Sequence, residues 1–262
     1  MHLSSIDVTR DGDIATVALN NPGKLNALTI AMWRELARVM RELSADDALR
    51  CIVLRGAGDE AFAAGADIDE FVAERATLAQ AKTYHHEYVY GVLQAVGECR
   101  HPTVAMIQGA CVGGGLEIAC NCDLRISGES GRFGVPINRL GFAIAYDELA
   151  GLLSLAGRAV AAEILLEGRV WNAQEALAKG LLTRVVPDDQ VEKEANATAR
   201  RIADGAPLVA RWHKKFIRRL TVAPSPLTAA EIDANFDYLK TDDYREGIDA
   251  FISKKKPKFV GK

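Results

Sequence analysis

The sequence predicts an α/β protein whose strands are largely parallel. Three short runs of β-branched and apolar residues, at 51–54, 103–107 and 123–126, are typical of buried strands. Loops rich in small residues, at 55–67 and 108–115, follow the first two runs, and a helical pattern follows each loop. This alternation of strand, turn and helix predicts a parallel sheet with sites where strands lead into helices.

The chain opens with a predicted hairpin and helix. Residues 6–20 alternate apolar and polar side chains around Asp11 and Gly12, a pair that tolerates the positive φ of a tight turn. Thr29 can cap a following helix, which we expect to end near residues 44–47. Apolar side chains recur in that helix at helical spacing, at Met32, Leu36, Met40 and Leu43.

A long helix is predicted for the middle of the chain. A first helix begins near Asp67, and residues 77–99 form a longer one that His101 and Pro102 end. After Gly157 the pattern is helical almost to the end. The apolar face of the long helix holds Tyr84, Tyr88, Val92, Ala95 and Cys99.

Composition excludes several classes of protein. With 262 residues, 49% of them apolar, the chain can bury a substantial core as one large domain or one domain with an appendage. A net charge of -3 gives no global attraction to nucleic acid or to an anionic membrane. The first ten residues lack an apolar signal core, and no run approaches about 18 uninterrupted apolar residues. We expect a soluble cytoplasmic protein.

Neither the cysteines nor the histidines predict a metal site. The five cysteines include no C-x-x-C pair, which favours reduced thiols in the core. The five histidines show no metal-ligand spacing. His85 and His86 are adjacent, so we expect their side chains to point away from each other on a helix.

A glycine run predicts the first functional turn. Gly113, Gly114 and Gly115 precede Leu116 and Glu117 at the start of a helix that we expect to end at Cys122. Backbone N–H groups at a helix start have no intrahelical partner, so they can bind an anion or a developing oxyanion. Glu117 beside them is a candidate acid/base group. The glycines alternatively only allow close packing, and Glu117 complements the helix dipole.

A second turn, at residues 62–67, also joins a strand to a helix through small residues. A second N–H group could therefore converge on the same point. Two such turns, each after a buried strand, are the arrangement that an oxyanion hole requires.

The motifs of the chain resemble the successive signature blocks of the enoyl-CoA hydratase/isomerase (crotonase) family. The blocks are NNPGKLNAL at 20–28, AFAAGADIDEF at 61–71 and GACVGGGLEIACNCD at 109–123. Residues 163–187 and 246–254 also resemble that family. Because several spaced motifs occur in the right order over nearly the whole chain, the resemblance is specific.

The resemblance implies a spiral of ββα turns at residues 1–195, with the acyl-CoA site, and a C-terminal helical oligomerisation region at 196–262. It implies a homo-oligomer, a trimer or a dimer of trimers. The N–H groups of Ala66 and Gly114 would hold the thioester oxygen of an acyl-CoA substrate, and no separate cofactor is needed. The CoA-binding positions that match are Lys24, Leu25, the carbonyl of Ala64, Ile68, and the C-terminal pair Phe251 and Lys254, which would reach a neighbouring subunit.

One block departs from the family. Hydratases of this family use a second glutamate in a segment like F-G-x-P-E, where this chain has Ile137. The glycine-rich loop that follows in relatives is replaced by residues 142–148. Asp147 or Glu148 could supply the missing carboxyl from that loop. Alternatively, Asp147 caps the next helix and Glu148 complements its dipole.

Two basic clusters, at 211–219 and 254–258, could suggest nucleic-acid contacts. Apolar side chains interrupt the first at helical spacing, which indicates a solvated helix face with a buried stripe. We therefore expect no nucleic-acid partner and no membrane partner, and a local site for the CoA phosphates explains Lys254 more simply.

Three functions remain open from the sequence. The first is a 2-enoyl-CoA hydratase-like lyase, and the second is an enoyl-CoA isomerase or another single-carboxylate member of the family. The third is a CoA-ester binding protein without turnover, which Ile137 favours and Glu117 disfavours. The length and chemistry of the acyl chain cannot be read from the residues.

Overall fold

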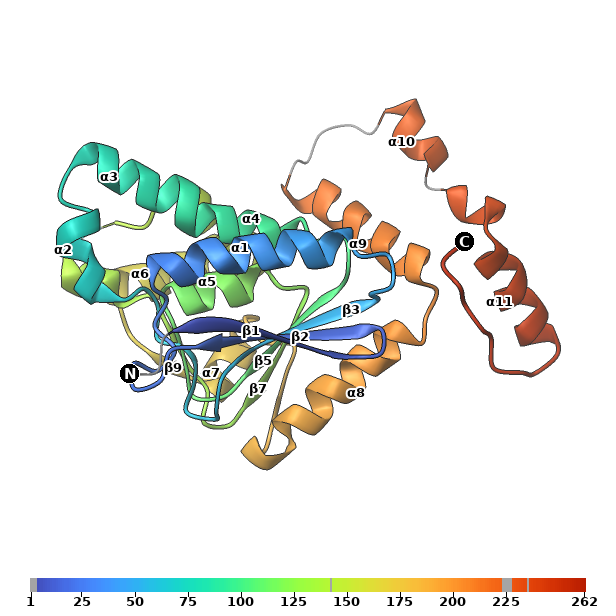
Figure 1. The fold of residues 1–262 in the computed structure, drawn as a ribbon, viewed down its shortest axis with the longest axis horizontal. Helices are drawn as coiled ribbons and strands as arrows, with labels where there is room; N and C mark the ends of the chain where they lie inside the picture. Colours follow the sequence, from blue (N-terminus) through green and yellow to red (C-terminus); the bar gives the residue numbers. More distant parts are fainter. Residues whose placement is uncertain (1–3, 142, 223–227, 235) are drawn as a thin grey trace.

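The fold is described from a computed structural model (Figure 1). It covers residues 4–141, 143–222, 228–234 and 236–262, without the side chains of Val72, Val222 and Phe251. Two sheets form the centre, helices cover them, and the last helices lie apart from the rest (Figure 1).

The larger sheet has six strands in the order β1-β2-β3-β5-β7-β10. β1 and β2 form the predicted antiparallel hairpin, in which Asp11 pairs with Ile14. The other neighbouring strands are parallel, which confirms the predicted sheet. The strands are Ser5–Asp11 (β1), Ile14–Asn20 (β2), Cys51–Gly56 (β3), Thr103–Ile107 (β5), Leu124–Gly128 (β7) and Arg184–Val186 (β10).

A smaller sheet lies beside it, with the order β4-β6-β8-β9. Each of β3, β5 and β7 in the large sheet is followed by β4, β6 or β8 in the small sheet, and then by a helix. The chain thus repeats a ββα turn three times, as the resemblance implied. The strands are Ala61–Ala63 (β4), Ala110–Val112 (β6), Arg132–Gly134 (β8) and Trp171–Asn172 (β9).

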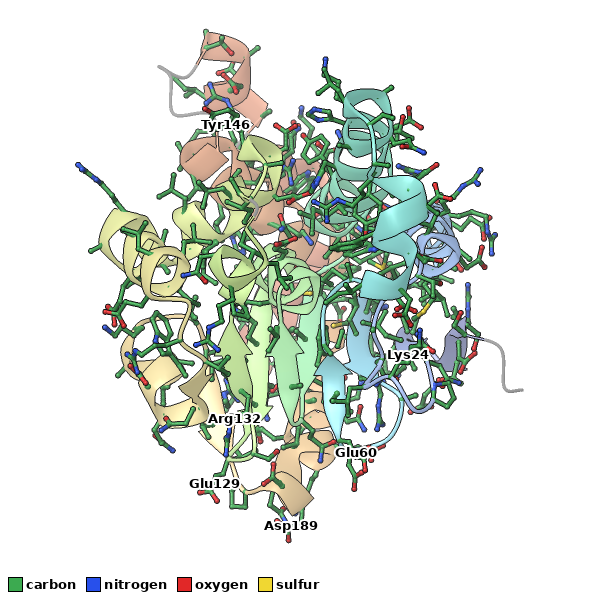
Figure 2. All side chains as sticks on the ribbon, turned by 90° about the vertical axis from the view of Figure 1, so that its left-hand side faces the viewer. Lys24, Glu60, Glu129, Arg132, Tyr146 and Asp189 are labelled. Atoms are coloured by element: carbon green, nitrogen blue, oxygen red, sulfur yellow. The ribbon has the colours of Figure 1, made fainter. Side chains whose placement is uncertain are left out.

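Three strands of the small sheet, β4, β6 and β8, point toward one end of the molecule. Figure 2 shows Glu60 and Arg132, at the starts of β4 and β8, near one end, and Tyr146, the first residue of α6, at the other. β4, β6 and β8 are parallel, so their carboxyl ends and the turns that follow them gather at the same edge.

Helices cover both faces of the large sheet. On one face α1 (Ile30–Ala45), capped by Thr29 as predicted, packs on α4 (Tyr90–Gly97). On the other, α8 (Val191–Ala203) buries Ala195 and Ala199 against the strands. The large core between α1, α4 and the sheet includes Trp33, Leu36, Met40, Ile52, Leu54, Val92 and Val96.

The region after β4 differs from the sequence prediction in detail. The predicted loop at 55–67 contains β4, because Ala61 and Ala63 pair with β6. The helix near Asp67 is only a 3-10 turn (Ile68–Glu70) and a short α2 (Phe71–Glu74). The long helix at 77–99 is confirmed as α3 (Leu78–Lys82), a π-helical segment (Thr83–Val89) and α4.

The second half also departs from the all-helical prediction. β9 and β10 interrupt it, because residues 171–172 pair with β8 and residues 184–186 extend the large sheet. These strands are too short for a periodic signal. The helices that precede β10 in this part of the chain are α5 (Gly114–Asn121), α6 (Tyr146–Glu167) and α7 (Ala173–Ala178).

Helix α6 is long and apolar. Within the described part of the chain, it is the only helix that is long enough and apolar enough to cross a membrane. Its most apolar stretch has a mean hydropathy of 1.7. Length and composition alone are weak evidence for a span. α6 packs on α5 and on the π-helical segment, and Gly157, at φ 76°, interrupts its helical backbone.

The C-terminal helices leave the core. They are α9 (Pro207–Val222), α10 (Ala229–Ala234) and α11 (Asp242–Ile252). α10 and α11 lie at the far side of the molecule from α2, α3 and α6 (Figure 1). The division predicted at residue 195 falls inside α8, which still packs on the sheet, so separate roles for the two regions stay a prediction.

Candidate active site

A pocket of about 150 Å³ opens where the turns after β4 and β6 meet the helices. Its wall is mostly apolar and includes Trp33, Phe71, Val112, Ile137 and Leu140. The polar and backbone groups are fewer and come from five segments: the turn 64–66, Arg75, the π-helical segment with His85, residues 113–117, and Glu148 of α6. An apolar pocket with a few converging polar groups is typical of a small-molecule site.

The two predicted turns meet in this pocket. Gly65 and Gly113 have positive φ angles of 99° and 53°. A Cβ atom on Gly65 would lie 3.5 Å from the Gly114 nitrogen, and one on Gly114 would lie 3.9 Å from the Ala66 nitrogen. The N–H groups of Ala66 and Gly114 are therefore close neighbours, as predicted.

These N–H groups are available to a ligand. Gly114 is the first residue of α5, so its N–H has no partner inside the helix. Within the residues that the structure describes, neither N–H donates a hydrogen bond. Other backbone hydrogen bonds hold the two turns in place. Leu28 N–H donates to the Gly65 carbonyl at 2.7 Å, and Gly113 N–H donates to the Gly134 carbonyl at 2.8 Å.

Glu117 reaches the pocket from the first turn of α5. It is buried, with 7% of its surface exposed. Burial, first, and the negative charge of Glu148, second, raise the pKa of the Glu117 carboxyl well above its usual range. No side chain of the described residues hydrogen-bonds to this carboxyl. Glu117 is thus placed to hold or release a proton in the pocket.

Glu148 supplies a second carboxyl to the same pocket. It lies in the first turn of α6, and only 5% of its side chain is exposed. Its Oε1 is 2.5 Å from Nδ1 of His85, and its Oε2 accepts the Ala145 N–H at 3.4 Å. Glu148 therefore caps its helix and also faces Glu117, so the two interpretations of this residue are compatible.

Asp147 does not share that position. Its side chain is 43% exposed, and its Oδ2 lies 3.1 Å from Nδ1 of His86 at the surface. It is absent from the pocket lining, so of the two alternatives, Asp147 or Glu148, the geometry favours Glu148. Adjacent residues of a helix point in different directions, and only Glu148 faces inward.

The sequence prediction missed His85 and Arg75. His85 and His86 were expected to diverge, yet both contact the first turn of α6, because the π-helical segment lies across it. Arg75 ends α2, and its Nη2 lies 2.8 Å from Nε2 of His85. No local signal could reveal these contacts, since His85 and Glu148 are 63 positions apart.

Three of the predicted CoA-binding positions lie around the pocket mouth. Ala64 and Ile68 line it, and Ile68 is exposed. Leu25 is also exposed, at a φ of 49°, and its carbonyl accepts the Ala64 N–H at 3.0 Å. The loop 20–28 is thus bonded directly to the turn after β4.

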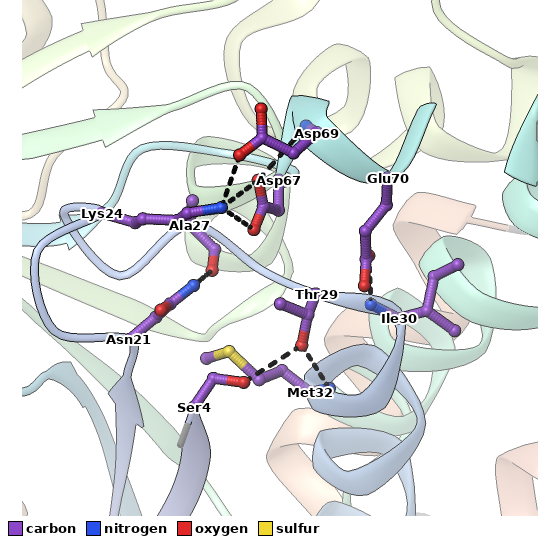
Figure 3. A network of polar contacts seen from close by, with 10 residues as sticks. All are labelled: Ser4, Asn21, Lys24, Ala27, Thr29, Ile30, Met32, Asp67, Asp69 and Glu70. Carbon is purple, nitrogen blue, oxygen red and sulfur yellow. Dashed lines mark hydrogen bonds and ion pairs between the residues drawn. The ribbon is translucent and has the colours of Figure 1, made fainter. Parts of the chain in front are cut away.

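Lys24 is held by two carboxylates beside the same turn (Figure 3). Its Nζ lies 2.7 Å from Asp67 Oδ2 and 2.7 Å from Asp69 Oδ2. These hydrogen bonds raise the pKa of the Lys24 ammonium, so it keeps its positive charge. The cation is exposed at the surface next to Ile68, where an anionic ligand could reach it.

Lys254 does not line the pocket of its own chain. α11 and the segment after it lie at the opposite side of the molecule from α2 and α6 (Figure 1). Lys254 is exposed, at a φ of 53°. The side chain of Phe251 lies outside the described residues. Any role of these residues at this site requires another copy of the chain.

The described residues contain no group of three His, Cys, Asp or Glu side chains placed to hold a metal ion. All five cysteines are buried and reduced. Burial raises the pKa of the Cys51, Cys120 and Cys122 thiols to about 12, so they remain protonated at neutral pH.

Comparison with known proteins agrees with this geometry. The sequence profile of the enoyl-CoA hydratase/isomerase family matches residues 9–262. A probable enoyl-CoA hydratase of Mycobacterium bovis is 35% identical over 99% of both chains. A short-chain-enoyl-CoA hydratase of Clostridium acetobutylicum is 30% identical over 98% of this chain and 97% of its own.

Solved structures agree as well. A protein of Magnetospirillum magneticum, described as an enoyl-CoA hydratase/carnithine racemase, superposes with a TM-score of 0.96 at 51% identity, covering 99% of this chain and 97% of its own. An enoyl-CoA hydratase of Bacillus anthracis gives a TM-score of 0.90 at 29% identity, covering 99% of both chains. The chain belongs to the enoyl-CoA hydratase/isomerase family, with the crotonase fold.

Proposed function

We propose that this protein is an enoyl-CoA hydratase that adds water to 2-enoyl-CoA thioesters. The observation that supports this most is the pair of carboxyl groups, Glu117 and Glu148, in one pocket with the N–H groups of Ala66 and Gly114, which have no hydrogen-bond partner among the described residues. Hydration needs both parts: donors for the thioester oxygen, and groups that move protons at the α and β carbons.

The chemistry follows from the thioester. When water adds to the β carbon, electrons move toward the carbonyl, and negative charge develops on its oxygen. The two N–H groups stabilise that charge, and loss of one such donor costs on the order of 100- to 1000-fold in rate. One carboxyl accepts a proton from the water and the other delivers a proton to the α carbon, so one water is added in total.

The CoA part of the substrate would bind at the pocket mouth. Lys24, beside Ile68, offers a cation to the CoA phosphates, and Leu25 and the Ala64 carbonyl border the path into the pocket. Lys254 and Phe251 would complete the site from a neighbouring copy, in a trimer or a dimer of trimers. We propose that the protein acts in the cytoplasm, without a metal or redox cofactor.

An isomerase is the second candidate, and Ile137 favours it. Ile137 lines the pocket at the position where hydratases of the family carry their second glutamate. If Glu148 does not exchange protons, Glu117 alone could move a proton between carbons. A CoA-ester binding protein without turnover is the third candidate.

Absorbance of the conjugated enoyl thioester separates these functions. Purified protein is incubated with a panel of 2-enoyl-CoA and 3-enoyl-CoA thioesters. A hydratase removes the absorbance of the 2-enoyl thioesters, whereas an isomerase creates it from the 3-enoyl thioesters. Binding without either change would refute the hydratase proposal and support the third candidate. The panel also defines the acyl chains that are accepted.

A further inference from the structure

Three hydrogen-bonded polar side chains line the same pocket as the two glycine turns. Arg75 Nη2 lies 2.8 Å from His85 Nε2, and His85 Nδ1 lies 2.5 Å from Glu148 Oε1. His85 is mostly buried, with 16% of its side chain exposed, and Glu148 is more so. All three residues line the same pocket as Glu117.

The chemistry of arginine determines which atom donates in each of these two hydrogen bonds. A guanidinium group has N–H donors and no acceptor, and it does not lose its proton in proteins. His85 Nε2 must therefore accept, which leaves the imidazole neutral with its proton on Nδ1. That Nδ1–H then donates to Glu148 Oε1. Because Glu148 Oε2 also accepts the Ala145 N–H, both of its oxygens act as acceptors.

We propose that Arg75 and His85 are positioning residues that hold Glu148 ionised, so that Glu148 takes the proton of the attacking water and Glu117 delivers the proton to the α carbon. This division of roles rests on the proposed hydratase function.

The proton balance of this step is complete. Glu148 begins as a carboxylate and Glu117 as a carboxylic acid. The water oxygen bonds to the β carbon while its proton moves to Glu148, and Glu117 gives its proton to the α carbon as the carbon–carbon double bond becomes single. Glu148 is then protonated and Glu117 is ionised. One proton passing from Glu148 to Glu117 restores the starting state.

The surroundings of the two carboxyls support this assignment. In the described residues the Glu148 carboxyl has two hydrogen-bond donors, His85 and the Ala145 N–H, and the Glu117 carboxyl has none. The other titratable groups around the His85–Glu148 pair are Arg75 at the end of α2, Tyr84 in the π-helical segment, and Glu117 on α5. A negative charge on Glu148 further favours the protonated form of Glu117.

The tautomer of His85 can be measured without any turnover. Nitrogen-15 NMR of the full-length protein reads the protonation of each imidazole nitrogen, and the His85→Asn variant assigns the signal. We expect a single tautomer of His85, with the proton on Nδ1 and none on Nε2, because Arg75 can only donate to Nε2. An imidazolium, or a proton on Nε2, would overturn the proposal.

Three variants test the effect on catalysis. His85→Leu removes the donor to Glu148, whereas His85→Asn keeps an N–H near the position of Nδ1 and cannot ionise. We expect His85→Leu to lower kcat by about 10- to 100-fold and to move the acid limb of the pH–rate profile to higher pH, because Glu148 loses a bond that stabilises its charge. His85→Asn should recover most of both effects.

His86→Leu is the matched control. His86 makes the same kind of contact, to Asp147, between the same two helical segments, but at the surface and outside the pocket. We expect its rate and pH profile to equal those of the unmodified protein. An effect of His86→Leu as large as that of His85→Leu, or an unmoved acid limb in His85→Leu, would contradict the proposal.

The two proposals fail in distinguishable ways. Suppose that His85 is neutral with its proton on Nδ1, but the protein hydrates none of the thioesters. This result would refute the hydratase function and the proton roles of Glu148 and Glu117. It would not refute the hydrogen bonds from Arg75 through His85 to Glu148. Normal hydration with an imidazolium at His85 would refute only the proposed hydrogen bonds from Arg75 through His85 to Glu148.

Discussion

Glu117 and Glu148 face the same pocket from two different helices, and the charge of Glu148 adds to burial in raising the pKa of Glu117. Like charges that are close together in a dry pocket cannot both ionise easily. The Glu117 carboxyl is therefore disposed to keep its proton, as the proposed role of an acid requires.

Replacing Glu117 by Gln removes an ionisable group but preserves its shape. We expect turnover to fall by at least about 100-fold, the lower end of the range for an acid/base group, while CoA binding stays nearly unchanged. Hydration rates and calorimetric binding of a CoA thioester measure the two effects. Near-normal activity would refute the role given to Glu117.

Glu148→Gln and Asp147→Asn form a matched pair, because the residues are adjacent and only Glu148 lines the pocket. We expect Glu148→Gln to lose about 100- to 10,000-fold in hydration rate, and Asp147→Asn to lose less than about tenfold. If neither variant lost more than tenfold, Glu148 would not be the replacement for the missing family glutamate.

Gly114→Ala tests the N–H pair. The new Cβ would lie 2.8 Å from Cη2 and Cζ2 of Trp33, so the start of α5 or the ring must move. We expect a loss on the order of 100- to 1000-fold in kcat from the displaced N–H. Gly91→Ala is the control, since its Cβ would meet only Arg41 Nη2, at 3.8 Å. Equal activity of the two variants would argue against the oxyanion site.

The stability of the protein should depend on pH through Glu117. Its folded-state pKa is raised above the unfolded value of about 4.3, so the folded state binds more protons above that pH. The free energy of unfolding should therefore fall as pH rises above about 4. Glu117→Gln removes this effect, so urea unfolding should show it to be increasingly more stable than the unmodified protein from pH 5 to 8. A constant difference across that range would contradict the raised pKa.

Oligomerisation should complete the site. We expect light scattering to give a trimer or a dimer of trimers, because α11 lies at the far side of the molecule from α2 and α6 (Figure 1) and Lys254 does not line the pocket of its own chain. Lys254→Ala should then weaken CoA binding without changing the oligomer. A monomer that binds CoA tightly would refute this expectation.

Local patterns in the sequence were enough to predict much of the fold. The hairpin around Asp11 and the Thr29 cap depend on neighbours within a few positions. The glycine turns made Ala66, Gly114 and Glu117 candidates for the same reason, since a glycine run at a helix start dictates its own backbone. All three line the pocket, and their catalytic roles stay a prediction. The strands β9 and β10 were missed because two or three residues carry no measurable period.

By itself the sequence determined the family, the parallel α/β architecture and one carboxyl of the site, because these are set by order and spacing along the chain. Only the tertiary structure could show which of two neighbouring carboxyl groups lines the pocket with Ile137. Asp147 and Glu148 are chemically similar and adjacent, and the packing of α6 against the π-helical segment turns one to solvent and the other to His85 and Glu117. That orientation depends on contacts more than 60 positions apart, which no local pattern records.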